Sequence, residues 1–294
     1  MSTLAAPAAA PTAIRPARRF SIPPKWRNPI GMIGAVVILW TVCVALFAPL
    51  IAPYAPSEQK AKRLLGPGRA HLMGTDELGR DTLSRIIYGA RVSLQVGIIA
   101  VLIALVIGTL LGVVTGYYGG KTDTIIMRFV DIMFAFPVLI LAIVIAGLLG
   151  PSRRNAMIAI GVAYAPAFAR VIRGSVLSVV GEPYLEAGRV MGARDGWLIR
   201  RYVLPNILAP LLVLTSIYLS SAILSEAALS FLGLGAQPPE PSWGGMLSIA
   251  RTYMEISPWM AIFPGLAIMI VVLGFNFLGD GLRDILDPRL RENG

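Results

Sequence analysis

Residues 94–115 read LQVGIIAVLIALVIGTLLGVVT, a stretch that is apolar throughout apart from Gln95 and the small Thr109. It carries no charge, and a helix needs about 20 consecutive apolar residues to cross the hydrocarbon core of a bilayer. The stretch therefore predicts a transmembrane helix. Function has to be sought in a helical membrane bundle rather than in a soluble domain.

The composition of the whole chain indicates the same class. Of its 294 residues, 56% are hydrophobic and only 14% are charged, far outside the usual balance of soluble domains. The formal net charge of +10 could suggest a nucleic-acid partner. The basic residues are scattered between apolar runs, however, with no stripe of interleaved aromatic residues. We therefore expect no nucleic acid and attribute the charge to orientation in the lipid bilayer.

Five further apolar runs bring the expected number of transmembrane helices to about six. They cover residues 30–52, 125–150, 156–180, 207–234 and 259–278. We expect an all-α membrane protein made of a flexible basic cytoplasmic arm (1–28), transmembrane helix 1 (30–52), an external loop (53–93), a five-helix core (94–280) and a cytoplasmic tail (281–294). Alternating basic and apolar positions near residues 81–91 predict an amphipathic surface helix within the external loop.

The basic residues also predict how the bundle is oriented. Six crossings put both termini on one side, together with the arm, Lys121 and the arginines of residues 170–201. The positive-inside rule makes this side cytoplasmic. Arg170 and Arg173 are expected to reach the lipid headgroups. The external loop carries several basic residues too, but the first span, flanked by the basic arm, usually dominates orientation.

The chain lacks the residues of common catalytic and metal sites. Cys43 is the only cysteine and His71 the only histidine, which argues against a zinc or iron site and against a Cys/His catalytic pair. Residues 116–122 end in Gly-Lys-Thr, as a phosphate-binding loop does, but the first glycine of that motif would stand at position 115, which is threonine. We expect no catalytic residue, no metal and no cofactor in this chain, and therefore no enzyme.

The most informative polar segment is residues 182–204, EPYLEAGRVMGARDGWLIRRYVL, followed by Pro205. Pro183 is typical of a helix start, the glycines of residues 192–196 break the helix, and Asp195 can cap a second one. Pro205 marks the entry into the next apolar run. The segment predicts two short helices joined by a glycine turn, standing off the membrane.

Such a helical pair is suited to insertion into the cleft of a partner protein. Glu186 offers a carboxylate to a basic partner, Gly192 allows close backbone approach, and Trp197 offers an anchor. An ordinary solvated connector is equally compatible with the pattern.

Glu226 is the one acid well inside an apolar run. A charge at the bilayer centre costs about 3 kcal/mol, so this side chain should face other helices or water. It could line a solute path or a gate, or it could be a hydrogen-bonded glutamate that ties helices together. Asp131, at the start of the third run, is the other acid that could serve a path or gate.

The 182–204 loop resembles the cytoplasmic Glu-Ala-Ala loop of the integral membrane permeases of ABC importers. The matching residues are Glu186, Ala187, Gly188, Gly192, Leu204 and Pro205, with Gly188 in place of the second alanine. The chain is also similar to the C-type permease of the peptide/nickel (dipeptide/oligopeptide) branch, over residues 71–94, 225–235, 238–244 and 276–288. The resemblance covers nearly everything after Asn28.

The resemblance implies a type I permease fold and a transport role whose chemistry lies in other subunits. It implies a heterodimer of two related permeases, two cytoplasmic ATPase subunits that bind ATP and magnesium, and an external solute-binding protein, in a bacterial cytoplasmic (inner) membrane. The 182–204 loop would carry the coupling helix, with Asp195 and Trp197 joining the matched residues in contacts with the ATPase. The spans would then swing between inward-facing and outward-facing states, which is transport by alternating access.

The leading hypothesis is therefore a permease that forms half of the translocation pathway for di- or oligopeptides. The same machinery could instead import nickel, glutathione or another small solute, because members of this branch differ in substrate and the binding protein makes most of the selection. A stand-alone channel or ion-coupled carrier, with Glu226 and Asp131 as coupling sites, is the alternative from a different class.

Overall fold

The computed structural model describes residues 29–286, and the all-α expectation is confirmed within them. The long helices are α1 (Pro29–Leu46), α3 (Thr82–Tyr118), α6 (Arg153–Val180), α9 (Leu204–Phe231) and α11 (Trp259–Leu286). The shorter ones are α2 (Ala48–Ile51), α4 (Gly120–Phe134), α5 (Val138–Leu149), α7 (Pro183–Val190), α8 (Asp195–Leu198) and α10 (Trp243–Ala250), with a π-helical turn η2 (Ile199–Val203) and a 3-10 turn η3 (Arg251–Tyr253). The expected arm at residues 1–28 and the last part of the expected tail, residues 287–294, lie outside the described residues.

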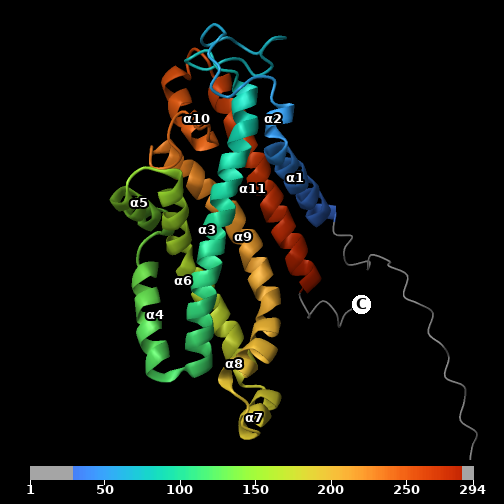
Figure 1. Cartoon of the computed structure of the whole chain (residues 1–294), viewed down its shortest axis with the longest axis vertical. Coiled ribbons are helices and arrows are strands. Elements are labelled where there is room, and N and C mark those ends of the chain that lie inside the picture. The colour runs from blue at the N-terminus through green and yellow to red at the C-terminus, as the bar shows by residue number, and fades with distance from the viewer. Residues whose placement is uncertain (1–28, 287–294) are drawn as a thin grey trace, which may run out of the picture.

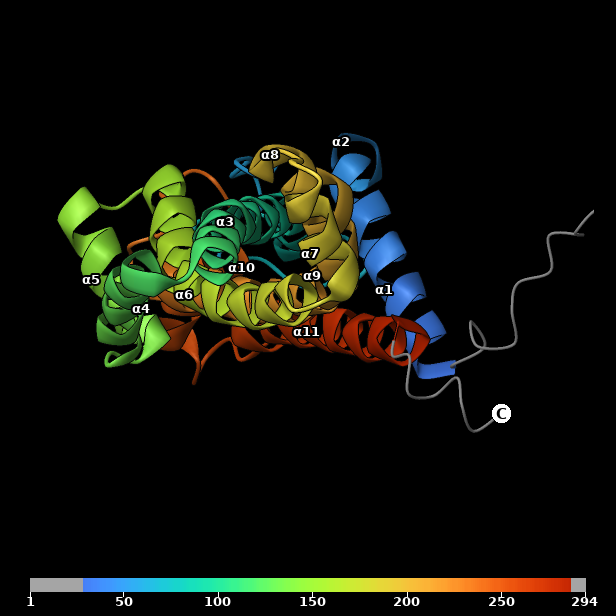
Figure 2. The same cartoon turned by 90° about the horizontal axis from the view of Figure 1, so that it is seen from below.

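The long helices run side by side along the bundle, and the connecting segments gather at its two ends (Figure 1). The 182–204 loop, with α7 and α8, lies at one end, which we call the loop end. Residues 52–81 and 232–258, the latter with α10, lie at the opposite end, and we call them the distal loops. Figure 2 views the bundle from the loop end, with α4 and α5 on one side and α1 on the other.

Glycines bring α3 and α6 into close contact, and these two helices share the longest interface in the bundle. A Cβ atom added at Gly112 would lie 2.7 Å from the Ala169 carbonyl oxygen, and one added at Gly116 would lie 2.8 Å from Cβ of Val176. Real Cβ atoms do not show contacts this short, so only glycine lets the two helices approach this closely. Small residues at helix contacts are the usual solution in membranes, where van der Waals packing replaces the hydrophobic effect.

The amphipathic surface helix predicted near residues 81–91 is not a separate element. Asp81 is the N-cap of α3, accepting a hydrogen bond from the Ser84 amide at 2.7 Å, and the helix then runs unbroken for 37 residues. At about 1.5 Å per residue it is roughly 55 Å long, well beyond a hydrocarbon core of about 30 Å. The alternating segment is thus the first turns of the second span. The expected tail likewise begins as helix, since α11 continues to Leu286.

The third span, predicted as one helix over residues 125–150, is bent by 92° between α4 and α5. The break falls at Ala135–Pro137, where proline lacks the amide hydrogen that a continuous helix needs. The pair still leads from one end of the bundle to the other. Just before it, Tyr117 contacts the 182–204 loop, and just after it, Arg153 lies 3.3 Å from Glu240 in a distal loop. Within the described residues, five single helices are long and apolar enough to span a membrane, and the crossings number six if the bent pair counts as one broken span.

Candidate functional site

The 182–204 loop has the two short helices that its sequence predicts. Pro183 stands in the first turn of α7, and α7 ends just before Gly192. Gly192 has φ = +78°, a left-handed conformation that costs glycine little and side-chain-bearing residues more. After this turn, α8 starts at Asp195.

The inner face of the loop is anchored in an apolar cluster. Leu185, Leu198 and Val203 are fully buried there, packed with Ile172 and Val176 of α6. These contacts fix α7 and α8 against the ends of the long helices. The loop is therefore a packed part of the bundle rather than a free connector.

Gly188 lies where α7 meets α8. A Cβ atom at this position would stand 2.8 Å from Cδ2 of Leu198, the mobile end of a side chain. The glycine that departs from the Glu-Ala-Ala pattern thus leaves room for the buried Leu198.

Asp195 does not cap the second helix, contrary to the sequence prediction. The N-cap residue is Arg194, which makes no side-chain capping bond. Instead, the Tyr117 hydroxyl of α3 donates to Asp195 Oδ1 at 2.8 Å, and the Arg189 guanidinium lies 5.0 Å from the centre of the Tyr117 ring. Asp195 therefore ties the loop to α3.

The outer face of the loop presents apolar and acidic side chains to solvent. Glu186 and Ala187 are exposed on α7, and Trp197 is 52% exposed on α8. Val190 and Met191 are 84% and 82% exposed beside the glycine turn, and the sequence analysis did not identify them. Helical periodicity could have identified these two residues as exposed, because Leu185 and Gly188 mark the buried face of α7. Exposed apolar residues gathered at a loop tip are typical of a docking surface.

Leu204 and Pro205 begin α9, but the chain does not start a new helix there. Helical structure runs without a break from Asp195 to Phe231, passing through the π-helical turn η2. Pro205 fits near the start of α9 because the wider turn precedes it. The expected site residues thus lie in one compact element, with Gly188 and Asp195 toward the bundle and Glu186 and Trp197 toward solvent.

Glu226 lies inside the bundle on α9 and is only 1% exposed. The Ser230 hydroxyl, one turn further along, donates to Glu226 Oε1 at 2.7 Å. Oε2 has no hydrogen-bond partner in the part of the chain that the structure describes. In this conformation Glu226 is packed between helices rather than placed on an open surface.

Asp131 lies on α4 and forms an ion pair with Arg170 of α6 at 2.5 Å, with both side chains more than half exposed. A second pair lies nearer the loop end, where Arg173 donates two hydrogen bonds to Asp123, each 2.6 Å long. The two arginines therefore pair with acids on a neighbouring helix, where the sequence predicted contact with headgroups. Their acidic partners lie 39 and 50 residues earlier in the chain, so spacing along the chain could not reveal the pairs.

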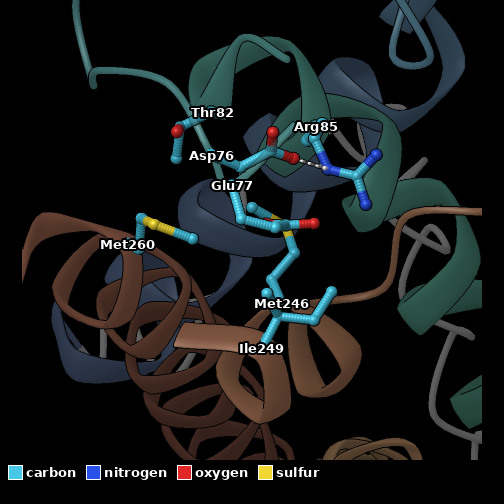
Figure 3. A pocket seen from close by; sticks show the side chains of 7 residues that line it. All are labelled: Asp76, Glu77, Thr82, Arg85, Met246, Ile249 and Met260. Atoms are coloured by element: carbon cyan, nitrogen blue, oxygen red, sulfur yellow. Dashed lines mark ion pairs between the residues drawn. The ribbon is translucent and has the colours of Figure 1, made fainter. Parts of the chain in front are cut away.

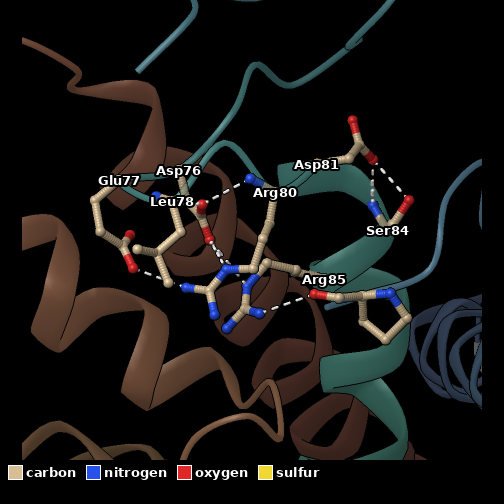
Figure 4. Close-up of polar contacts among 8 residues, drawn as sticks. Asp76, Glu77, Leu78, Arg80, Asp81, Ser84 and Arg85 are labelled. Carbon is tan, nitrogen blue, oxygen red and sulfur yellow. Dashed lines mark hydrogen bonds and ion pairs between the residues drawn. The ribbon is translucent and has the colours of Figure 1, made fainter. Parts of the chain in front are cut away.

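The distal loops contain a buried charge network that the sequence analysis missed (Figure 4). Arg80 Nε donates to Asp76 Oδ2 at 2.6 Å and its Nη2 to Glu77 Oε1 at 2.7 Å. Arg85 Nε lies 3.4 Å from Asp76 Oδ2, and Arg85 Nη1 donates to the Pro56 carbonyl at 3.0 Å. The acid-to-arginine spacing between Asp76 and Arg80 was a signal that could have predicted part of it. The network fixes the loop onto the start of α3.

The same network faces the helices of the second distal loop. Figure 3 looks into a small pocket lined by Asp76, Glu77, Thr82, Arg85, Met246, Ile249 and Met260, the last three from α10 and α11. Within residues 29–286, no three of the His, Cys, Asp and Glu side chains lie close enough together to hold a metal ion.

Comparison with known proteins relates this architecture to membrane transport. Residues 108–292 match the family described as binding-protein-dependent transport system inner membrane component, and residues 26–67 match the N-terminal transmembrane domain of oligopeptide transport permease C. The chain is 47% identical over 266 residues to the dipeptide transport system permease protein DppC of Alkalihalophilus pseudofirmus, covering 90% of this chain and 88% of that protein. It is 45% identical over 267 residues to the glutathione transport system permease protein GsiD of Pectobacterium atrosepticum, covering 90% and 89%.

A solved structure supports the fold. A chain of the MetNI methionine ABC transporter, in an inward facing conformation, superimposes with a TM-score of 0.57 at 21% identity, covering 70% of this chain and 97% of that one. At this identity the similarity concerns the fold alone, and it confirms the type I permease expectation.

Proposed function

The chain belongs to the family of binding-protein-dependent transport system inner membrane components, and from this premise we propose that it forms half of the translocation pathway of an ATP-driven importer of di- or oligopeptides. Its expected partners are a second, related permease, two cytoplasmic ATPase subunits and an external solute-binding protein. ATP and magnesium are bound by the ATPases, and this chain supplies no catalytic residue or cofactor.

The observation that carries this proposal is the two-faced geometry of the 182–204 loop. Its inner face is locked to the bundle by buried side chains such as Leu198, whereas its outer face offers Glu186 and Trp197 to a partner. A docking element that is rigidly attached to the spans can pass a partner's movement to them. We assign Glu186, Ala187, Gly192 and Trp197 to contact with the ATPase.

The remaining residues of the coupling set hold this surface in position. Gly188 leaves room for Leu198, and Asp195 binds the Tyr117 hydroxyl. Leu204 and Pro205 join the loop to α9. They act on coupling through the placement of the loop.

The loop end lies in the cytoplasm in this proposal, with both termini, and the membrane is the bacterial cytoplasmic (inner) membrane. With α4 and α5 counted as one broken span, the crossings number six, which supports termini on one side. Local pairing reduces the weight of the basic residues in the external loop against this orientation. Arg80 and Arg85 are buried beside Asp76 and Glu77, and Lys60 lies 2.7 Å from Glu58, so the charges of these three residues are locally compensated.

Alternating access assigns different roles to the two acids within the spans. The ion pair of Asp131 and Arg170 is more than half exposed, and charged groups facing lipid are costly, so we place this surface toward the water-filled pathway or the second permease. Glu226 is buried and bonded to Ser230, which favours the role of tying helices together. An ion-coupled carrier that relies on both acids has less support from this arrangement.

Charge reversal at Glu186 and bulk at Gly192 test the coupling role. We expect Glu186→Lys and Gly192→Trp to leave membrane insertion intact, to lower the amount of ATPase that copurifies, and to abolish uptake of a labelled dipeptide. Glu58→Lys, the same charge reversal on the distal loop, should leave ATPase copurification unchanged. Normal ATPase attachment and transport in both loop variants would refute the assignment.

Reconstitution distinguishes the substrate classes and the stand-alone alternative. Proteoliposomes with the complete transporter and its binding protein should take up labelled dialanine in an ATP-dependent manner. Uptake of glutathione or nickel without dialanine would select the alternative importers. Solute movement down a gradient by this chain alone would favour a channel or carrier.

A further inference from the structure

A large cavity lies between α1, α3 and α11 on the side of the bundle near the distal loops. Its volume is about 540 Å³, and its walls include Thr41 of α1, Ile87 of α3, Trp243 of α10 and Val271 of α11. Pockets that bury a whole small ligand typically measure about 300–1,000 Å³. The cavity is thus large enough for a bound molecule rather than a packing defect.

The two buried polar side chains in the walls of this cavity already use their hydrogen-bond donors within the bundle. The Thr41 hydroxyl donates to the Val37 carbonyl at 2.8 Å, and Trp243 Nε1 donates to the Ile86 carbonyl at 3.0 Å. The other lining side chains are aliphatic, aromatic or thioether groups, and among them only Trp40, at the exposed rim, carries a further N–H donor. A peptide or a cluster of water molecules would lose hydrogen bonds there, whereas hydrocarbon would lose none.

The rim of the cavity belongs to the apolar outer surface of the bundle. Trp40 of α1 is 61% exposed and Leu266 of α11 is 42% exposed, and both line the cavity. The neighbouring surface is also apolar, with Leu39 65% and Met269 50% exposed. Only 17% of the α1 span is buried inside the bundle. The cavity therefore opens onto the surface that the spans present to lipid.

We propose that this cavity binds one acyl chain of a membrane phospholipid. The chain enters between α1 and α11 and reaches Trp243, which is only 2% exposed and lies on the non-spanning helix α10. It thereby completes the contact between the N-terminal span and the core. The inference depends on the membrane location of the bundle and is independent of which solute is transported.

Photochemical labelling tests this site in the complete transporter. The transporter is placed in nanodiscs of phosphatidylethanolamine with a diazirine halfway along one acyl chain, illuminated, and mapped by peptide mass spectrometry. We expect adducts on Leu39, which faces bulk lipid, and also on Trp243, which does not reach the outer surface. Ala267→Phe, which fills the cavity from α11, should reduce the Trp243 adduct at least tenfold and leave the Leu39 adduct unchanged.

Two further variants keep the test decisive. Met269→Phe adds a ring on the same helix outside the cavity and should leave the Trp243 adduct unchanged. Val44→Phe fills the cavity from α1 and replaces Ala267→Phe if that variant fails to assemble. Absence of a Trp243 adduct in the natural protein, which is also the result expected if a partner subunit fills the cavity, overturns the proposal. Equal Trp243 labelling in the filled variants overturns it as well.

Discussion

Truncation of Leu198 should loosen the 182–204 loop without unfolding the bundle. Leu198 is fully buried between α7 and the long helices, beside Leu185 and Val203. Its truncation therefore removes buried apolar contacts and leaves a cavity. Replacing a buried leucine by alanine costs about 2–5 kcal/mol. Because each 1.4 kcal/mol is a factor of ten, local opening of the loop should become roughly 30 to 4,000 times more frequent in Leu198→Ala.

Hydrogen exchange measures that opening directly. In nanodiscs containing the complete transporter, amide protection across residues 183–203 should fall by this factor in Leu198→Ala, while protection in α11 stays unchanged. Dipeptide uptake should fall in parallel. Leu148→Ala, on α5, removes the same side chain where it is 84% exposed, so it should leave loop protection intact. Protection in Leu198→Ala within about threefold of the natural protein would show that buried packing does not hold the loop, since the factor expected is at least ten times larger.

Two further predictions concern the charged pairs. Arg173→Ala removes the bidentate partner of Asp123, whose side chain is only 19% exposed, and should lower uptake at least tenfold. The exchange of Asp123→Arg with Arg173→Asp should restore much of it, and a double variant as poor as the single one would contradict the pairing. Arg85→Met leaves Asp76 with one cation fewer, and breaking a buried pair costs about 3–5 kcal/mol, so the midpoint of thermal unfolding should fall by several degrees. Lys60→Met, on an exposed side chain, is the control, and equal midpoints in the two variants would refute the network's role.

Hydropathy was sufficient to predict the bundle, because crossing a bilayer imposes a minimum apolar length on every span. It could not locate helix ends. Asp81 caps α3 before the hydrophobic run begins, so the helix extends through residues that read as a surface segment. The bend at Pro137 was likewise invisible, because a proline inside an apolar run is compatible with a kink or a break.

The two short helices of the 182–204 loop were predictable for a related reason. Pro183 and Gly192 impose backbone conformations that leave a local trace in the sequence. The partners of Asp195, Arg170 and Arg173 leave no such trace, since each lies on a different helix and is chosen by packing. Residues whose role depends on a distant neighbour are therefore the ones that sequence reasoning misplaced.

The unbroken run from Asp195 to Phe231 makes the second half of the 182–204 loop one end of a rod. At about 1.5 Å per residue this rod is roughly 55 Å long, so a tilt of about 5° moves its far end by about 5 Å relative to its near end. The helical hydrogen-bond pattern along it changes at the turn Ile199–Val203, and Pro210 inside α9 removes one backbone donor. A push on Trp197 must therefore either swing α9 as a whole, moving the segment that leads to α10, or be absorbed near these two places.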